Sequence, residues 1–436
     1  MEVQNNPKRS EIFKMPSLLL ADTTLGNIIQ ELPAELASMA REFRAFARVR
    51  VVRSPEELLR AVLLYCGLDY SLREVAANFT QLGRRLSDEA VRGRLSACEP
   101  WLEAMLRQML PKPDVEITQH SNRLILVDGT CIQAPGATSP DYRLHLGWDW
   151  MQQRVVHIEV TDFRTGESLK LYDWQPGDVA LADAGYAKAP QLKAVTEKGA
   201  EFVVRCAPTS IRMLLETGEK LNIAAELKKH EGEREVTLRV RIDSGENSQD
   251  AYLHAYRLSE SAAEKARRKV RRRASKASRP TPKADTLYLA EWMILLTSFK
   301  PEQVSAESIG KVYRARWQVE LVIKRLKSVL NIDGLRARRG GRLAQVYLLG
   351  KSIYALMIEK RALRMSRTRE IEWRVWRIVA DHIRGWITLS DLLGPEINRD
   401  VLKVLKERSR KRQRLRTKIA GIVQKLGLKP IQINNL

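Results

Sequence analysis

The sequence predicts an α/β protein, in which a mixed sheet with helices is set between helical N-terminal and C-terminal regions. Two observations carry this prediction. Apolar residues follow a helical period up to about residue 115, and from about residue 120 the period becomes that of strands. Helical patterns return after residue 298 and continue to the end of the chain. A chain of 436 residues is longer than one ordinary domain, so we expect two or three domains.

The charge of the chain is unusual. Its 75 Lys and Arg residues outnumber its 52 Asp and Glu residues, which gives a formal net charge of +23. A positive field of this size attracts polyanions, of which nucleic acid is the commonest. A ribosome-associated protein, a membrane-surface binder and a merely soluble basic protein would share this feature, so charge alone does not choose among them.

The cysteine and apolar patterns exclude several classes. The cysteines lie far apart without a CxxC pair, and the histidines supply no HxxxH partner, so we expect no zinc site and four reduced thiols packed in cores. The N-terminus lacks the apolar stretch of a signal peptide, and no apolar run approaches the roughly 18 residues of a membrane span. We therefore expect a cytoplasmic protein that does not bind membranes. The four cysteines are Cys66, Cys98, Cys131 and Cys206.

Residues 1–115 are expected to form a helical domain. Apolar residues recur at helical spacing from Pro55 to Gly67, and two helices capped by Ser71 and Ser87 follow. The first of these has a Glu three residues after its serine, which fits a capping box. The pair, at residues 71–95, resembles a helix-turn-helix whose second helix would enter the major groove of DNA. An ordinary helical hairpin fits the same pattern, so both alternatives stay open.

Two of the expected strands end in an aspartate. Leu124–Val127 precedes Asp128, and Asp178–Ala182 precedes Asp183. Each aspartate is followed by a turn that contains glycine. A carboxylate at the end of a buried strand contributes little to stability, but it suits a hard cation such as Mg²⁺. The other expected elements are strand-like runs at Arg154–Thr161, Ser168–Leu171 and Gly199–Cys206 and a helix at Ala189–Glu197.

Two basic runs stand out in the second half. Lys265–Lys283 holds ten Lys or Arg and no acid, and its two prolines favour a mobile loop. It follows an expected β-hairpin at 235–258 and precedes an apolar strand at Leu287–Ser298. The second run is Lys406–Lys418, in which Glu407 is the only acid. Each run alone could be a solvated face, but two in one chain favour a polyanion partner.

A helix that begins near Val312 carries the most informative pattern. Four of its side chains fall within about 60° of one another on the helix surface. On spacing alone, an exposed Arg–Glu pair worth a few tenths of a kcal/mol is the simpler interpretation. Asp128 and Asp183 change this balance, because two Mg²⁺ ions held by carboxylates can activate the attacking oxygen and stabilise the leaving oxygen. The four side chains are Tyr313, Arg316, Glu320 and Lys327.

These residues resemble those of DDE transposases of bacterial insertion sequences, in the insertion-sequence-four group with the Y-x2-R-x3-E-x6-K (YREK) signature. The helix at Val312 matches that signature at every spacing. The segments Val-Asp128-Gly-Thr and Ala-Asp183-Ala-Gly-Tyr match the surroundings of the first and second catalytic aspartates of the family. The resemblance covers roughly residues 115–385.

The resemblance implies an RNase H-like catalytic domain at 116–385, with a β-rich insertion at about 200–298. It would lie between a helical DNA-binding domain at 1–115 and a basic helical C-terminal region at 386–436. Asp128, Asp183 and Glu320 would be the catalytic residues and would ligate two Mg²⁺ or Mn²⁺ ions.

Five further residues would bind DNA if the resemblance holds. Tyr313, Arg316 and Lys327 would hold phosphates near the cut. This suits their chemistry, because Tyr donates a hydroxyl hydrogen, Arg donates two parallel N–H groups and Lys supplies a localised positive charge. Arg205, in Phe-Val-Val-Arg, would contact the transposon end. Trp292 resembles a tryptophan that stabilises a flipped base, but a core tryptophan on an apolar strand is the alternative we favour.

The implied reaction is endonuclease cleavage at the ends of the element and strand transfer into target DNA, by a homodimer assembled on the DNA and acting at the nucleoid. Two alternatives remain: a non-catalytic DNA-binding regulator derived from a transposase, and another RNase H-like nuclease or recombinase. The terminal-repeat sequence, the target preference and a hairpin step in cleavage have no recognisable signal in the sequence.

Overall fold

The structure is a computed structural model that describes most of the chain between residues 32 and 365. The described residues are 32–81, 84–111, 123–134, 136–150, 152, 154–337 and 340–365, with six more positions between 376 and 384. The region predicted at 386–436, with the basic run Lys406–Lys418, lies outside them. The chain divides into two compact units: residues 110–335, and the residues before and after that range. The domain boundaries expected at 115 and 385 stay predictions.

One unit is helical and joins the N-terminal helices to the long helix α13. Ser71 and Glu74 form the expected capping box: the Glu74 amide donates to the Ser71 hydroxyl at 3.2 Å, and the Ser71 amide donates to the Glu74 carboxylate at 2.7 Å. Ser87 caps the next helix by accepting from the Ala90 amide at 3.1 Å. The helices are α2 (Leu36–Glu42), α3 (Pro55–Val62), α4 (Leu72–Gln81), α5 (Asp88–Ser96), α6 (Glu99–Met109) and α13 (Arg342–Met365), with a π-helical turn at Leu63–Gly67.

A buried ion pair ties α13 to this helical unit. Lys351 is fully buried, and its Nζ lies 2.8 Å from Oδ1 of Asp69, just after the π-helical turn. Tyr347 donates its hydroxyl to the same oxygen at 2.5 Å. Because an unpaired buried charge costs several kcal/mol, these contacts select this packing of α13 against the N-terminal helices.

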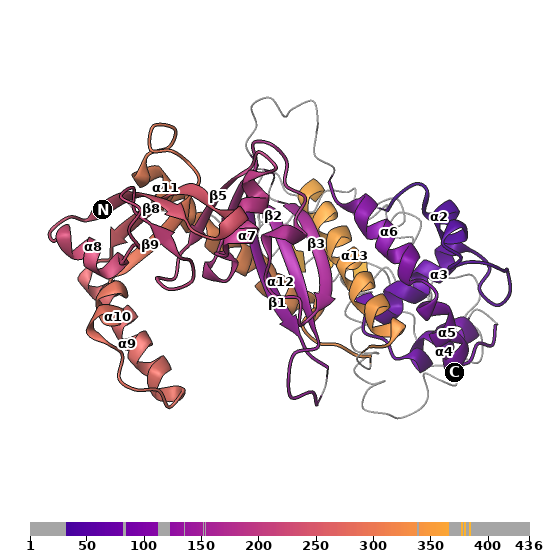
Figure 1. Cartoon of the computed structure of the whole chain (residues 1–436). Helices are drawn as coiled ribbons and strands as arrows, with labels where there is room; N and C mark the ends of the chain where they lie inside the picture. Colours follow the sequence, from indigo (N-terminus) through magenta and orange to yellow (C-terminus); the bar gives the residue numbers. More distant parts are fainter. Residues whose placement is uncertain are drawn as a thin grey trace, which may run out of the picture. The chain divides into compact units, whose positions relative to one another are not determined.

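The second unit is built on one nine-stranded sheet with the order β3-β2-β1-β4-β5-β9-β8-β7-β6 (Figure 1). β1, β4 and β5 run parallel, and the other neighbouring pairs are antiparallel. The strands are β1 (Leu124–Ile132), β2 (Tyr142–Asp149), β3 (Arg154–Asp162), β4 (Val179–Ala182), β5 (Glu201–Arg205), β6 (Met213–Leu214), β7 (Glu235–Ile242), β8 (Gln249–Arg257) and β9 (Trp292–Thr297).

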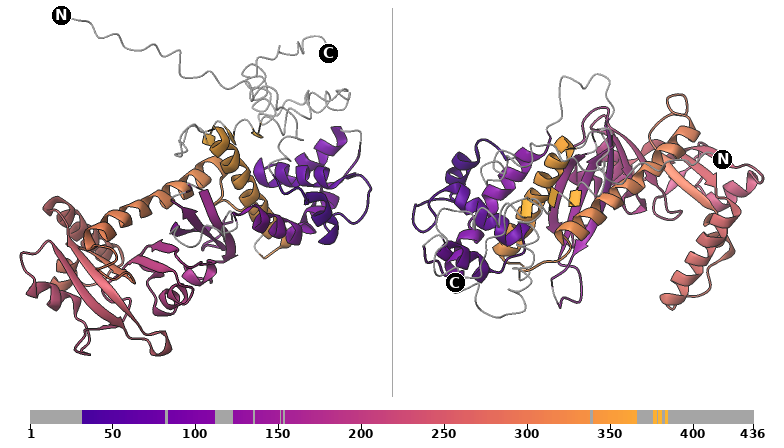
Figure 2. Two further views of the ribbon diagram at one scale, coloured as in Figure 1. Left: turned by 90° about the horizontal axis from the view of Figure 1, so that it is seen from above. Right: turned by 180° about the vertical axis from the view of Figure 1, so that it is seen from behind.

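Helices cover both faces of the central strands. α7 (Ala189–Thr196) packs on one face, where Leu192 joins a buried cluster with Val127 and Val204. α12 (Trp317–Leu330) crosses the other face and contacts β1 and β2 (Figure 2). Because side chains alternate along a strand, Asp128 points to the opposite side of β1 from Val127. Asp128 therefore faces α12.

The chain between β5 and β9 contains both helices and strands, and its strands extend the same sheet. It contains the hairpin β7–β8, which confirms the expectation at 235–258, and β8 pairs with β9. It also holds the helices α8 (Ile223–Lys229), α9 (Glu260–Lys276) and α10 (Ala284–Leu289). The strand expected at Leu287–Ser298 is thus shorter than predicted, because residues up to Leu289 are helical and β9 begins at Trp292.

The expectation of a mobile loop at Lys265–Lys283 was wrong for most of that run. Residues up to Lys276 belong to the 17-residue helix α9, which extends away from the sheet (Figure 1). Ala, Arg and Lys are strong helix formers, so the composition itself favours this helix. The prolines lie beyond Ser278, whose φ of +49° ends the helical path. Arg267 anchors the helix by pairing with Glu291 at 2.6 Å.

Smaller corrections concern local structure. Asp128 lies inside β1, which runs on to Ile132, and not at its end. The expected strand at Ser168–Leu171 is a 3₁₀ turn, because the Ser168 hydroxyl accepts from the Lys170 amide at 3.2 Å. All four cysteines are free, but Cys131 is exposed and not packed in a core. Among the described helices, none combines the length and apolar character needed to cross a membrane.

Candidate active site

The three predicted metal ligands come from three neighbouring elements. Asp128 lies in the middle of β1, and Asp183 directly follows β4, the parallel neighbour of β1. Glu320 lies in the first turn of α12, which packs on β1. The parallel pairing of β1 with β4 and the packing of α12 therefore bring these carboxylates to one region of the sheet.

Asp128 is strongly affected by its surroundings. Burial raises the pKa of its carboxyl group from the usual 3.8 to about 6, and the nearby charges of Glu167 and Glu320 add to this rise. The Gly129 amide, which donates to Asp128 at 2.8 Å, and the charge of Arg316 oppose it. Asp128 thus has two acidic neighbours and one basic neighbour.

Arg316 is the cation shared by the predicted carboxylates. Its guanidinium donates to Glu320, one helical turn later, and its side chain is only 15% exposed. Burial lowers the pKa of Arg316, but the hydrogen bond to Glu320 and the charges of Tyr313, Asp183 and Glu320 outweigh it, so the pKa is raised. Arg316 therefore interacts with all three predicted ligands.

Tyr313 connects this cluster to the end of β5. It ends α11 (Ala306–Tyr313), a 3₁₀ turn at Arg314–Arg316 separates it from α12, and its side chain is buried. Burial raises the pKa of Tyr313, Arg316 and Arg205 lower it, and Asp183 raises it. Arg205, the last residue of β5, is exposed. The electrostatics thus connect Tyr313 with Asp183 and Arg316 on one side and with Arg205 on the other.

Two other predicted residues lie apart from this cluster. Lys327, two turns along α12, lies 3.7 Å from Asp333. Trp292 is 3% exposed, and its ring packs near Tyr288 and under the guanidinium of Arg257, 5.8 Å from the ring centre. Burial of the indole favours the core alternative for Trp292, and its contact with DNA stays a prediction.

The donor set suits hard divalent cations, although the carboxylates stand apart from one another. Among the described residues, no three His, Cys, Asp or Glu side chains converge as a ready-made metal site. Like charges repel, and Glu320 is engaged by Arg316 instead. Three carboxylates on adjacent elements nevertheless match the oxygen ligands that Mg²⁺ and Mn²⁺ prefer.

Glu167 and Arg143 belong to no motif in the sequence, but the fold brings them together. Arg143 Nη1 on β2 lies 3.3 Å from Oε1 of Glu167, in the loop between β3 and β4. The charge of Glu167 acts on both Asp128 and Tyr186. Glu167 does not follow an apolar run as Asp128 and Asp183 do, and it belongs to no spaced motif with them. Only the fold brings it to them, so no sequence signal could have identified it.

Known proteins match most of this chain. Residues 119–356 match the transposase DDE domain family. The putative transposase InsL for insertion sequence element IS186A of Escherichia coli K12 is 33% identical over 335 residues, which cover 75% of this chain and 90% of that protein. The transposase for insertion sequence element IS421 of Escherichia coli is 33% identical over 336 residues, with the same coverage. The transposase for IS231F of Bacillus thuringiensis subsp. israelensis is 21% identical over 306 residues, 62% of this chain and 64% of that protein. The chain therefore belongs to the DDE transposases of insertion sequences, enzymes that cut and join DNA in a reaction that depends on divalent metal.

Proposed function

We propose that Asp128, Asp183 and Glu320 are the catalytic carboxylates of this transposase and hold two Mg²⁺ or Mn²⁺ ions. The observation that carries the proposal is the position of Arg316, whose charge interacts with all three. Bound cations would activate the attacking oxygen and stabilise the leaving oxygen of the cleaved phosphodiester. The chain's own carboxylates orient these cations, and α12 and the sheet keep the ligands on rigid elements.

We further infer which residues hold the DNA. The partly buried guanidinium of Arg316 can exchange the carboxylate of Glu320 for a phosphate, because both groups offer oxygens to its N–H donors. Tyr313 supplies a hydroxyl beside it, and Lys327 and Arg205 add positive charge along α12 and at the end of β5. Such contacts position the cleaved strand and carry little sequence information.

The fold and assembly follow from the same proposal. The strand order β3-β2-β1-β4-β5, with three antiparallel strands followed by two parallel additions, supports an RNase H-like core. β5 and β9 then bracket the insertion. A homodimer that pairs the two transposon ends before strand transfer into target DNA completes the proposed reaction.

The direct test uses the full-length protein, Mg²⁺ and DNA that carries the ends of its own element. We expect nicking at the ends followed by joining to a target plasmid. Asp183→Asn should abolish both steps, whereas Asp173→Asn, an exposed aspartate ahead of β4, should not. Binding without cleavage by the wild-type protein would instead support a DNA-binding regulator. Cleavage without joining would support another nuclease of this fold.

A further inference from the structure

The carboxylate of Glu167 lies in the space that a side chain at position 185 would fill, because residue 185 is a glycine. A Cβ atom at Gly185, two residues after Asp183, would lie 2.2 Å from Oε2 of Glu167. The other oxygen of Glu167 is held by Arg143 at 3.3 Å. The Glu167 side chain is 31% exposed, so it is partly buried in this position. Glycine at 185 is thus needed for the observed placement of the Glu167 carboxylate.

Arg143 reaches Glu167 past a second glycine. Gly129 follows Asp128 directly, and a Cβ there would lie 3.7 Å from Cδ of Arg143, in ordinary contact. The Arg143 side chain is 18% exposed, and its buried Nε has no hydrogen-bond partner among the described residues. The Arg143 side chain therefore passes Gly129, the residue after Asp128, and pairs with Glu167. Glu167 in turn lies against Gly185, in the segment that follows Asp183.

We propose that Glu167 is a fourth acidic side chain of the active site, a positioning residue held by Arg143 that binds the catalytic divalent cation through water. This inference rests on the proposed function of Asp128 and Asp183. Mg²⁺ keeps several of its waters in protein sites, and their hydrogens need acceptors. Glu167 is a partly exposed carboxylate that lies against Gly185 and whose charge acts on Asp128, so it can be such an acceptor. Partners of this kind commonly change metal affinity by about 10- to 100-fold.

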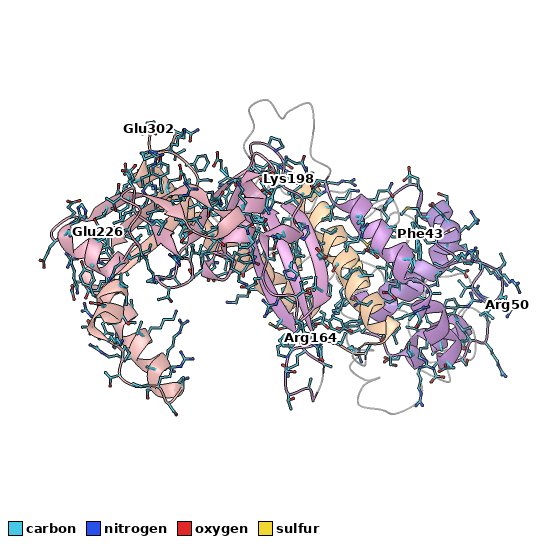
Figure 3. The ribbon with its side chains drawn as sticks, in the orientation of Figure 1. Phe43, Arg50, Arg164, Lys198, Glu226 and Glu302 are labelled. Carbon is cyan, nitrogen blue, oxygen red and sulfur yellow. The ribbon has the colours of Figure 1, made fainter. Side chains whose placement is uncertain are left out.

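The first test is Glu167→Gln, which keeps the shape of the side chain and removes its charge. Mn²⁺ and Mg²⁺ binding to the full-length protein without DNA is measured by isothermal titration calorimetry. We expect about tenfold weaker binding and an apparent melting temperature in EDTA that is unchanged or higher. The control is Glu197→Gln, an exposed glutamate after α7. Glu197 adjoins Lys198. Figure 3 shows Lys198 above the central strands and Arg164, three residues before Glu167, below them.

The second test displaces the carboxylate without removing its charge. Gly185 does not have a positive φ, so Gly185→Ala suits the backbone, and its methyl group would displace only the mobile end of Glu167. We expect Gly185→Ala to weaken cation binding as Glu167→Gln does. In a Glu167→Ala background the same change should cost little more. This non-additivity is the mark of two residues that act through one contact.

The outcomes separate this inference from the proposed function. Weaker cation binding in Asp183→Asn and in both Glu167→Gln and Gly185→Ala supports both proposals. Loss in Asp183→Asn, with wild-type affinity in Glu167→Gln, would overturn the role of Glu167 alone. Equal affinity in wild type and Asp183→Asn would overturn the proposed function itself. A lower melting temperature in EDTA with unchanged cation affinity would reduce Glu167 to a structural partner of Arg143.

Discussion

Arg316 donates a hydrogen bond to Glu320 where the 3₁₀ turn Arg314–Arg316 passes into α12. The sequence left two interpretations of Glu320, an exposed ion pair and a metal ligand, and the structure combines features of both. The pair exists, but the Arg316 side chain is only 15% exposed and also interacts with Asp128 and Asp183. Glu320 is thus paired with an arginine that also interacts with both aspartates, whereas the arginine of an exposed surface pair would interact with its own partner alone.

Glu320→Gln should therefore abolish the chemistry and spare DNA binding. Neutralising this carboxylate removes a proposed ligand and relieves repulsion with Asp128 and with DNA phosphate. We expect cleavage and strand transfer in Mg²⁺ to fall by several orders of magnitude, because no other group replaces the metal. Binding of transposon-end DNA, measured by gel shift, should be equal or tighter.

The matched control for this change is Glu307→Gln. Glu307 pairs with Lys311 at 2.7 Å with the same spacing on α11, and both side chains are exposed. An exposed pair contributes at most a few tenths of a kcal/mol, so this variant should keep wild-type activity. If Glu320→Gln retained strand transfer as Glu307→Gln does, Glu320 would be only an ion-pair partner.

The sequence predicted those parts of the site that depend on local pattern. Apolar runs located β1 and β4 and hence Asp128 and Asp183, and helical spacing put Arg316 and Glu320 one turn apart. It did not predict the effect of Glu167 on Asp128, since Glu167 lies in the loop between β3 and β4, far from Asp128 in the sequence. Local pattern cannot predict an interaction that depends on the order of strands in the sheet.

The main error in the fold came from a conflict between two local signals. In Lys265–Lys283 the prolines indicated a loop, whereas the Ala, Arg and Lys residues favoured a helix. The prolines follow the helix and do not interrupt it. Arg267 supplies the tertiary contact, to Glu291, that anchors α9 to the sheet unit. The position of the helix end decided the outcome, and it was not visible from composition.

The raised pKa of Asp128 predicts a pH-dependent difference between the wild type and Asp128→Asn in EDTA. The native pKa of about 6 lies above the usual 3.8, so the native state holds its proton more tightly than the unfolded chain. This contribution to stability is complete below pH 4 and is lost as the pH rises through 6. Asn cannot ionise, so Asp128→Asn should be more stable than wild type at pH 8, by at most about 3 kcal/mol, with a smaller difference at pH 5.

Thermal unfolding at the two pH values checks this prediction. The buried His145, whose pKa burial lowers to about 4, gives the opposite slope in both proteins, so the comparison cancels it. Added Mg²⁺ should stabilise only the wild type, because the cation requires the ionised carboxylate. A difference that does not change between pH 5 and pH 8 would contradict the raised pKa.

The helix α9 should supply sequence-independent contacts to DNA phosphates. Arg268, Arg271 and Arg272 are exposed on it, and changing all three to Gln should weaken binding to every DNA sequence about equally. The slope of log affinity against log salt should flatten by roughly 0.9 for each phosphate that the variant no longer binds. Arg267 is left intact because it anchors the helix.

A second triple variant controls for the loss of charge in the α9 test. Lys228, Lys229 and Lys311 lie in the same unit, and each pairs with an acid at 2.7 Å. Their change to Gln removes the same formal charge away from α9. Equal salt slopes for the two triple variants would show that α9 only contributes to net charge.

Trp292 provides a prediction that separates packing from DNA distortion. The indole is 3% exposed at the start of β9, so Trp292→Ala should leave a cavity and lower stability by about 3–5 kcal/mol. Trp292→Phe keeps most of the apolar volume and an aromatic ring over which Arg257 can lie, so it should melt closer to wild type and keep both cleavage and strand transfer.

A role of Trp292 in base flipping predicts the reverse. Both variants would then fold and nick the first strand. Trp292→Ala would stop at a later step that needs a flipped base, because stacking on the indole offsets part of the cost of unpairing that base. Melting curves together with a time course of nicked, cleaved and joined DNA distinguish these results. A stable Trp292→Ala protein that accumulates nicked ends would move Trp292 from the core to the DNA interface.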